Sequence, residues 1–326
     1  MVDSAVDPAE QLSLDISGPN VAEQFYSDEV ENFFVDGTFV IDDVNGTPTV
    51  GGVGLNLVGD GDDHFELESF AAAVWNIDGD GVGTVTTDIA TTFSGIDEID
   101  GSHGVDTVNF NLTGTDIEFR SRESNDIINV ANVGVGVITV QAGSGEDVIN
   151  VTNSGGGVEL FGGDGNDLFN ITNNGSTINA FGEVGDDTYV VDLTGNALVN
   201  IVDSVNAEND TLLANGTTGG DHFIFDVNGL SVGGAGGGTG SLAFVGIENF
   251  DFFGGDGDDL FEVRGASADI FTIDGGIGND RFLVNDMGNG GNANTLQISV
   301  ADPSAAPVDR LRLDISSYIT DLFFDD

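Results

Sequence analysis

The chain has 326 residues and carries 57 acidic side chains against 6 basic ones, which gives a formal net charge of −51. This balance argues against nucleic acids and anionic membranes as partners, because binding to phosphate requires many Lys and Arg side chains, and it favours cations. Cysteine is absent, so neither a disulfide framework nor a thiolate metal site is available. A hydrophobic fraction of 39%, with 23 Phe, is too high for a solvated tail and predicts a packed core.

The N-terminal residues 1–58 show no basic region followed by an apolar stretch, and no run of about 18 apolar residues occurs anywhere in the chain. We therefore expect neither a Sec-type signal nor a membrane span, and export by another route. The segment ENFFVDGTF resembles the later segment ENFDFFGGDG. Residues 1–58 are predicted to form degenerate coils or a cap rather than a separate catalytic domain.

An internal repeat becomes visible from residue 59 onward when the chain is aligned on an Asp that precedes two alternating apolar residues. The first five of these are Asp106, Asp126, Asp147, Asp167 and Asp187, at steps of 20, 21, 20 and 20 residues, and Asp259 and Asp280 are 21 apart. Apolar residues stand two and four places after each Asp, and again nine and seven places before the next. Period-2 patterning of this kind predicts short strands with one buried face.

Two strands and two turns per repeat fit one coil of a parallel β-solenoid. We therefore predict an all-β fold, a right-handed parallel β-solenoid with coils of about 20 residues, over residues 59–300. Residues 301–326 are predicted to form a C-terminal coil or cap. Because LSLDIS near the start resembles LRLDIS near the end, we also expect an open assembly edge, with end-to-end self-association into filaments or a place in a longer repetitive chain.

A longer repeat relates residues 62–110 to residues 220–263, since both begin with Asp-His-Phe. It makes His64 equivalent to His222, and each is expected to point outward as a surface residue rather than to bind zinc or take part in catalysis. The arginines are sparse. Arg120 and Arg122 are expected to pair with the acidic surface.

The turns supply oxygen ligands only. Their glycines permit positive φ and close backbone approach, which is expected to direct carbonyl oxygens inward, and each Asp adds a carboxylate. Oxygen ligands at flexible spacing suit Ca²⁺ better than Mg²⁺. The simpler alternative is that each Asp caps its turn by bonding to local N–H groups.

The turn sequences resemble the hemolysin-type (RTX) calcium-binding nonapeptide G-G-x-G-x-D-x-U-x. Residues 162–170 (GGDGNDLFN), 254–262 and 275–283 match every position, while 59–67, 143–151 and 182–190 match in part. This resemblance implies a secreted protein whose coils are filled by several Ca²⁺ ions. That family repeats every nine residues with turns on both edges, whereas here the step predicts calcium on one edge, with a structural ladder of Asn132, Asn153 and Asn173 on the other.

The predicted calcium ligands are Asp63, Asp106, Asp126, Gly143, Gly145, Asp147, Gly163, Asp164, Gly165, Asp167, Asp187, Gly255, Asp256, Gly257, Asp259, Gly276, Gly278 and Asp280.

The sequence predicts a secreted or cell-surface protein with a structural, adhesive or extracellular-matrix role that folds or assembles on binding Ca²⁺. No catalytic residue is predicted. The alternative is a polysaccharide-active enzyme or a carbohydrate-binding module on a β-helix; the shortage of cationic side chains disfavours an enzyme that acts on anionic sugars, but paired carboxylates for glycoside hydrolysis remain open. An ice-binding face is disfavoured because Ala131 and Asp192 interrupt the rank formed by Thr152 and Thr172.

Overall fold

A computed structural model describes residues 55–285 except for 80, 88–89, 112–113, 133, 154, 174–175, 193–197, 204–207, 227–228, 235–239 and 265–269. It also describes strands at 11–15, 31–34, 38–43, 295–299, 310–314 and 322–325. The chain divides into two compact units: a first unit of residues 1–150 and 154–165, and a second unit of residues 151–153 and 166–326.

Every regular element in the described residues is a β-strand. The strands up to residue 165 are β1 (Gln11–Asp15), β2 (Glu31–Phe34), β3 (Thr38–Asp43), β4 (Leu55–Ser69), β5 (Ala73–Ile77), β6 (Gly83–Thr86), β7 (Ala90–Asp100), β8 (Asp106–Phe110), β9 (Ile117–Arg120), β10 (Ile127–Asn132), β11 (Val137–Ser144), β12 (Val148–Asn153) and β13 (Gly157–Asp164).

The later strands are β14 (Leu168–Asn173), β15 (Thr177–Val184), β16 (Thr188–Asp192), β17 (Leu198–Val202), β18 (Thr211–Asn215), β19 (Asp221–Asp226), β20 (Gly229–Gly234), β21 (Gly240–Val245), β22 (Asn249–Phe253), β23 (Leu260–Val263), β24 (Ile270–Asp274), β25 (Arg281–Asn285), β26 (Thr295–Ser299), β27 (Arg310–Asp314) and β28 (Leu322–Asp325).

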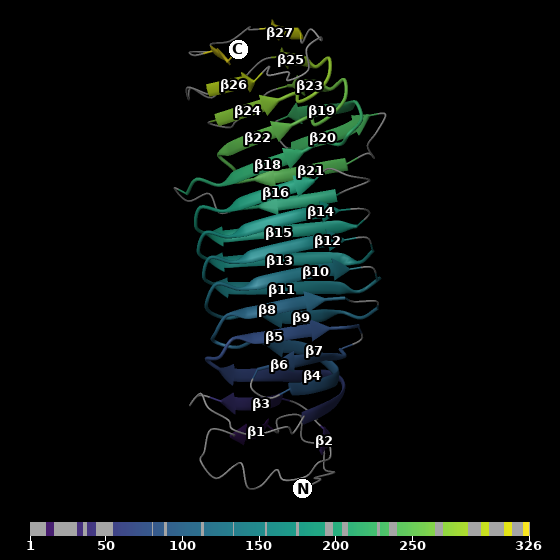
Figure 1. Cartoon of the computed structure of the whole chain (residues 1–326), viewed down its shortest axis with the longest axis vertical. Coiled ribbons are helices and arrows are strands. Elements are labelled where there is room, and N and C mark those ends of the chain that lie inside the picture. Colours follow the sequence, from purple (N-terminus) through teal and green to yellow (C-terminus); the bar gives the residue numbers. More distant parts are fainter. Residues whose placement is uncertain are drawn as a thin grey trace. The chain divides into compact units, whose positions relative to one another are not determined.

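Parallel pairing joins strands one coil apart, as Figure 1 shows for β8 to β11 in the first unit. In that unit β8 pairs with β10, while β9 pairs with β11 and β11 with β13. In the second unit β14 pairs with β16, and β15 with β17. These registers confirm the predicted parallel β-solenoid.

The core consists of the alternating apolar residues that the repeat predicts. Ile128 and Val130 follow Asp126, Phe169 and Ile171 follow Asp167, and all four side chains are 0–2% exposed. The strand that precedes the next turn contributes the same pattern. Rows of like residues stack along the coils; the rings of Phe169 and Tyr189, for example, lie 4.8 Å apart at 14°.

Antiparallel excursions interrupt the coils in both units. In the first, β6 pairs antiparallel with β5 and with β7; in the second, β20 pairs antiparallel with β19 and β21. These excursions account for the longer repeat, but its predicted alignment is wrong. His64 pairs with Glu98 in the strand before the Asp106 turn, whereas His222 pairs with Leu260 in the strand after the Asp259 turn, so the two histidines are not equivalent.

The Asp turns change edge within the second unit. The strands β14, β16, β18, β22 and β24 form one parallel row. Asp167, Asp187 and Asp210 precede strands of this row, whereas Asp259 and Asp280 follow its strands β22 and β24. The reason is that Asp210 and Asp221 are only 11 residues apart, so the single strand β18 separates two consecutive Asp turns. The expectation of motif turns on one edge is therefore wrong.

Parallel pairing continues beyond the central coils, as in β1 with β3, β3 with β4, β24 with β26 and β25 with β27. Whether residues 1–58 and 301–326 act as caps stays a prediction. Among the described residues no helix has the length and apolar character needed to span a membrane.

Candidate metal centre

The aspartates of the turns are buried at the ends of strands. Their side chains are 0–2% exposed. In the first unit they are Asp106, Asp126 and Asp147, and in the second Asp167, Asp187, Asp210, Asp221, Asp259 and Asp280. We call the stacked runs of these residues the aspartate columns.

Within a column, each carboxylate caps the turn of the coil before it. The N–H of Asp106 donates to Oδ1 of Asp126 at 2.7 Å, and the N–H of Asp126 donates to Oδ1 of Asp147 at 2.7 Å. The second unit repeats the contact from Asp167 to Asp187 (2.7 Å), Asp187 to Asp210 (2.9 Å), Asp221 to Asp259 (2.7 Å) and Asp259 to Asp280 (2.8 Å). The turn-capping alternative therefore describes one oxygen of each of these carboxylates correctly, although in these pairs the bond runs between coils and not within the turn.

The glycines of the motif let successive turns stack closely. Gly163 has a φ of 108°, and a Cβ on it would overlap the carbonyl oxygen of Gly143 in the preceding coil. Gly278 lies in the same way against the carbonyl oxygen of Gly257. The carboxylate also folds back over the first glycine of its own motif, since a Cβ on Gly254 would overlap Oδ2 of Asp259.

The second carboxylate oxygen is the unusual feature of the columns. In five residues this oxygen is buried and receives no hydrogen bond from the described residues. The five atoms are Oδ2 of Asp126, Asp187, Asp210 and Asp259 and Oδ1 of Asp221. Such an atom costs free energy unless a proton, a water molecule or a cation satisfies it. These oxygens are therefore the donor atoms that a metal ion would use.

Asp106 differs from the other column members because both its oxygens receive hydrogen bonds. Oδ2 accepts from the N–H of Ser102 at 2.8 Å, and Oδ1 accepts from the Ser102 hydroxyl at 2.8 Å and from the indole of Trp75 at 3.2 Å. Thr217 donates to Oδ2 of Asp221 in the same way, at 2.7 and 2.9 Å. A hydroxyl residue four places before the Asp thus supplies donors at the start of a column.

Burial raises the pKa of the carboxyls of Asp126, Asp187, Asp210 and Asp259, and neighbouring carboxylates raise it further. The hydrogen bond that each receives from the preceding coil lowers the pKa. Burial also raises the pKa of Asp106 and Asp147. The pKa rises to about 8 for Asp126 and Asp187, to about 7 for Asp210 and Asp259, and to about 6 for Asp106 and Asp147.

The other predicted ligands are placed differently. The carbonyl oxygens of Asp164 and Gly255 accept hydrogen bonds of 2.8 Å from Gly145 and Ile277 of neighbouring coils, so these carbonyls join coils instead of pointing inward to an ion. The side chains of Asp164 and Asp256 are exposed and stand apart from the columns. Asp63 lies in β4, and its side chain is outside the described residues. Gly143, Gly145, Gly163, Gly165, Gly255, Gly257 and Gly276 have positive φ, whereas Gly278 does not.

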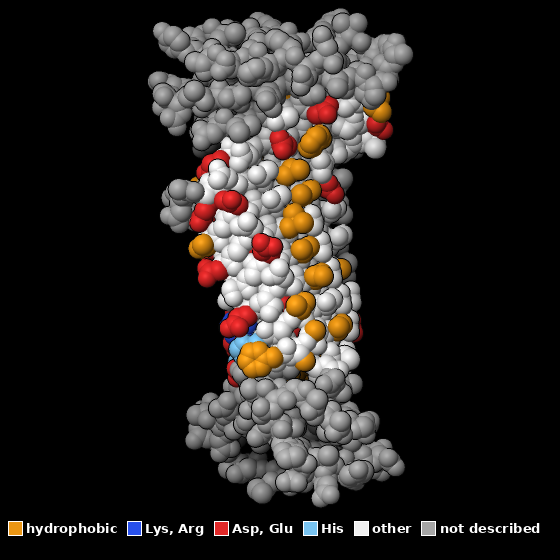
Figure 2. All heavy atoms as spheres, turned by 60° about the vertical axis from the view of Figure 1, so that its left-hand side comes forward, with side chains coloured by type: hydrophobic (Ala, Val, Ile, Leu, Met, Phe, Trp, Pro, Cys, Tyr) orange, Lys and Arg blue, Asp and Glu red, His pale blue; other side chains and the backbone are white. Residues whose placement is uncertain are grey.

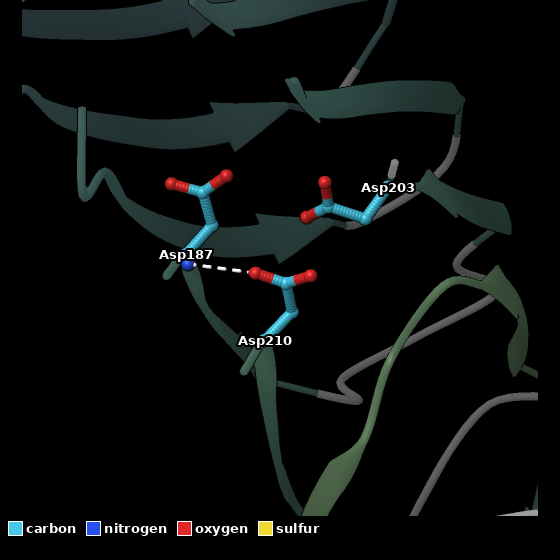
Figure 3. A group of neighbouring side chains, drawn as sticks. All are labelled: Asp187, Asp203 and Asp210. Carbon is cyan, nitrogen blue, oxygen red and sulfur yellow. Dashed lines mark hydrogen bonds between the residues drawn. The ribbon is translucent and has the colours of Figure 1, made fainter. Parts of the chain in front are cut away.

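A cluster that the sequence did not predict brings together Asp187, Asp203 and Asp210 in the second unit (Figure 3). All three residues are buried, and one oxygen from each lies within 4.8 Å of the others. Asp203 follows Val202, which pairs with Phe181 and Val245, so it occupies the position that is glycine in the adjoining coils (Gly182 and Gly246). That departure from the repeat is the signal in the sequence that would have identified it.

The ladder of Asn132, Asn153 and Asn173 stays a prediction, because their side chains are outside the described residues. A second amide ladder, which the sequence did not predict, runs along the outer face of the first unit, from Asn150 to Asn129 (3.0 Å), Asn129 to Asn109 (3.0 Å) and Asn109 to Asn76 (3.1 Å). These bonds reinforce the stacking of the strands.

Basic side chains bind acidic groups on the surface, as expected for Arg120 and Arg122. Arg120 contacts Glu98 (2.5 Å) and Asp100 (3.1 Å), and Arg122 contacts Asp100 (3.3 Å) and Glu66. His64 lies 3.3 Å from Asp100, whose hydrogen bond raises the pKa of the imidazole. Figure 2 shows many acidic and few basic side chains on the face that it presents.

Searches of protein-family models, of curated proteins and of solved structures each found no match to this chain. The site is therefore interpreted from its own geometry.

Proposed function

We propose that this protein is a calcium-stabilised β-solenoid that serves a structural, adhesive or matrix role outside the cell or at its surface. The observation that carries the proposal is the column of buried carboxylates, in which residues such as Asp126 and Asp259 have one oxygen bound to the preceding coil. In Asp126, Asp187, Asp210 and Asp259 the second oxygen has no hydrogen-bond donor among the described residues.

Such columns require positive charge or protons. Buried carboxylates stacked one coil apart repel one another and lose hydration, so the ionised column destabilises the fold. The chain has no lysine. The described ion pairs of Arg120, Arg122 and Arg264 are with surface carboxylates. At neutral pH the column is therefore stabilised either by protons or by bound cations.

The donor set fits a calcium ion. It consists of carboxylate oxygens, which Ca²⁺ prefers, and contains no nitrogen or sulfur ligand. Residues such as Asp126 and Asp259 would hold the ion through the second oxygen while the first remains bonded to the preceding coil. Bound Ca²⁺ would supply the positive charge that the columns lack.

A dependence on calcium would couple folding to the environment. Extracellular calcium modules bind with dissociation constants of ~0.1 to 1 mM, well above cytoplasmic calcium levels. The chain would therefore complete its fold after export, where it would present a rigid, strongly acidic surface. We infer the structural role from this surface and from the repetitive coils.

The experiment is thermal unfolding followed by circular dichroism at about pH 7.5, in EDTA and in millimolar CaCl₂, together with equilibrium dialysis to count bound calcium. We expect bound ions and a melting temperature that rises with calcium but not with an equal ionic strength of NaCl. A melting temperature that is the same in EDTA and calcium, with no bound calcium, would overturn the proposal.

A further inference from the structure

The coil that contains Asp203 departs from the repeat at two positions that meet in space. Asp203 stands where the adjoining coils have Gly182 and Gly246. Tyr189 stands in a row with Phe169 and Leu212 and is the hydroxyl-bearing member of it. The Tyr189 hydroxyl donates a hydrogen bond of 2.6 Å to Oδ2 of Asp203, so the two departures form one buried polar group.

The aspartate column supplies the other members of this group. Asp187 and Asp210 are 0% exposed, and the Oδ2 atom of each has no hydrogen-bond donor among the described residues. A Cβ built on Gly182 would overlap Oδ2 of Asp187, the Tyr189 hydroxyl and Oδ2 of Asp203 together. Oδ2 of Asp187 is therefore directed at Asp203, and Figure 3 shows the Asp203 carboxylate facing the other two.

We propose that Asp187, Asp203 and Asp210, with the Tyr189 hydroxyl beside them, form a calcium site inside the second unit, in which Asp203 adds a third carboxylate to two neighbouring members of the column. The inference rests on the proposed function for the choice of ion and deepens it by assigning a site that the turn motif does not encode. Carboxylates of three different turns or strands would share one ion there.

The spacing of the oxygens suits this ion. One oxygen from each carboxylate lies within 4.8 Å of the others. Two ligands on opposite sides of one Ca²⁺ are separated by roughly 4.6 to 5.2 Å, twice the usual bond length, and ligands on adjacent sides lie closer together. The three oxygens are therefore close enough together to bind a single Ca²⁺.

The hydrogen bonds of the cluster leave Oδ2 of Asp187 and Oδ2 of Asp210 available. Oδ1 of Asp187 receives the N–H of Asp167, and Oδ1 of Asp210 receives the N–H of Asp187. Oδ2 of both residues remains for a ligand. The Tyr189 hydroxyl holds Oδ2 of Asp203 in place, which makes Tyr189 a positioning residue.

The test uses Tb³⁺ as a luminescent substitute for Ca²⁺ in the full-length chain. The chain has only 3 Tyr and 1 Trp, and Tyr189 adjoins the proposed site. Excitation of tyrosine should therefore sensitise Tb³⁺ emission, which added Ca²⁺ should quench by competition. Tyr189→Phe should lower this emission to the part that Trp75, which adjoins Asp106, contributes, while leaving calcium bound.

Asp203→Gly restores the residue of the adjoining coils, and Asp203→Asn keeps the shape of the side chain. Both should lower calcium stoichiometry by about one ion per chain. Asp192→Asn is the control, because Asp192 lies at the other end of β16 and bonds to Thr172 and Asn215. It should leave stoichiometry and emission unchanged.

Two results would overturn the inference. If either foldable Asp203 variant retains full stoichiometry and tyrosine-sensitised emission, while Asp259→Asn loses an ion, calcium binds the columns but not this cluster. If the wild-type chain binds neither Ca²⁺ nor Tb³⁺, the proposed function fails together with the inference, and the cluster is an acid group held together by shared protons.

Discussion

The hydroxyl of Tyr189 and the carboxylate of Asp203 form a buried hydrogen bond of 2.6 Å between residues that are 14 positions apart. Asp203 lies outside the turn motif and stands where an adjoining coil has Gly182, whereas Tyr189 occupies the apolar position of a partial motif, where an adjoining coil has Phe169. This coil therefore contains a buried polar pair at positions where the adjoining coils have apolar residues or glycine.

This bond should be worth more than an average one. Tyr189→Phe should lower the free energy of unfolding in EDTA by about 1 to 3 kcal/mol, because it leaves the Asp203 oxygen buried without its donor. Asp203→Gly should cost less, since it removes a buried carboxylate although it leaves the Tyr189 hydroxyl without this acceptor, and the double variant, which removes both partners, should cost least. Urea unfolding of the wild type, the two single variants and the double variant gives the interaction free energy between Tyr189 and Asp203. Additive losses would contradict the described contact.

Substitution in a column should change apo stability and calcium binding in opposite directions. Asp126→Asn keeps an oxygen for the N–H of Asp106 but removes a buried negative charge. In EDTA at about pH 8 we expect it to stabilise the fold by about 1 to 3 kcal/mol, and in calcium to bind fewer ions. Glu146→Gln is the matched control, because Glu146 is exposed beside Asp147. A loss of stability in EDTA would show that the carboxylate is favourable as an anion.

The columns predict the pH dependence of the apoprotein. The pKa of Asp126 and Asp187 is raised from 3.8 to about 8 in the fold, and that of Asp259 to about 7. The folded chain therefore binds protons that the unfolded chain has already released, so their stabilisation is complete below about pH 4 and is lost as the pH rises through about 7 to 8. Urea unfolding in EDTA between about pH 5 and pH 8 should show falling stability.

The general repulsion of an acidic chain acts in the same direction, so the control must separate the two effects. Asp126→Asn should reduce the slope of stability against pH, whereas Glu146→Gln should leave it nearly unchanged. Saturating calcium should flatten the slope in the wild type, because Ca²⁺ competes with the protons. A stability that increases with pH in EDTA would contradict the raised pKa values.

Close stacking of the turns predicts a sharp contrast between two glycines. Gly278→Ala places a methyl group on the carbonyl oxygen of Gly257 and should destabilise the second unit by at least about 3 kcal/mol. Gly233→Ala is the control, because a Cβ there meets nothing within 4 Å. Its effect should stay within about 0.5 kcal/mol. Equal effects in thermal unfolding would show that the turns of the second unit are not stacked as described.

Much of the fold can be predicted from the sequence, because every coil repeats the same alternation of apolar and polar residues after a turn Asp. Alternation after each Asp predicts a buried strand, and residues such as Ile128 and Phe169 are buried as expected. A constant step of about 20 residues then predicts the stacking. The edge change was missed, because the alignment ran from Asp106 to Asp187 and resumed at Asp259, so it did not include the short step of 11 residues between Asp210 and Asp221.

The candidate site was predicted in part for a similar reason. The motif identifies residues by what they share, so it finds column members such as Asp126 and Asp259 but not Asp210, Asp221 or Asp203. Asp203 matters because it differs from the glycines at the same position in the adjoining coils. The shared Asp-His-Phe string misled the alignment, since His64 and His222 lie in different rows. The motif also could not show that the carbonyl of Gly255 is used to join coils.

The columns also have a direction. In every described pair the N–H belongs to the earlier coil and the carboxylate to the later one, as in Asp126 and Asp147. A chain that emerges from a ribosome or an export channel with its N-terminus first would thus have each turn completed by the next segment to appear. Each newly formed coil completes the hydrogen bonding of the coil before it, so the coils fold in the order in which they leave the ribosome or the channel.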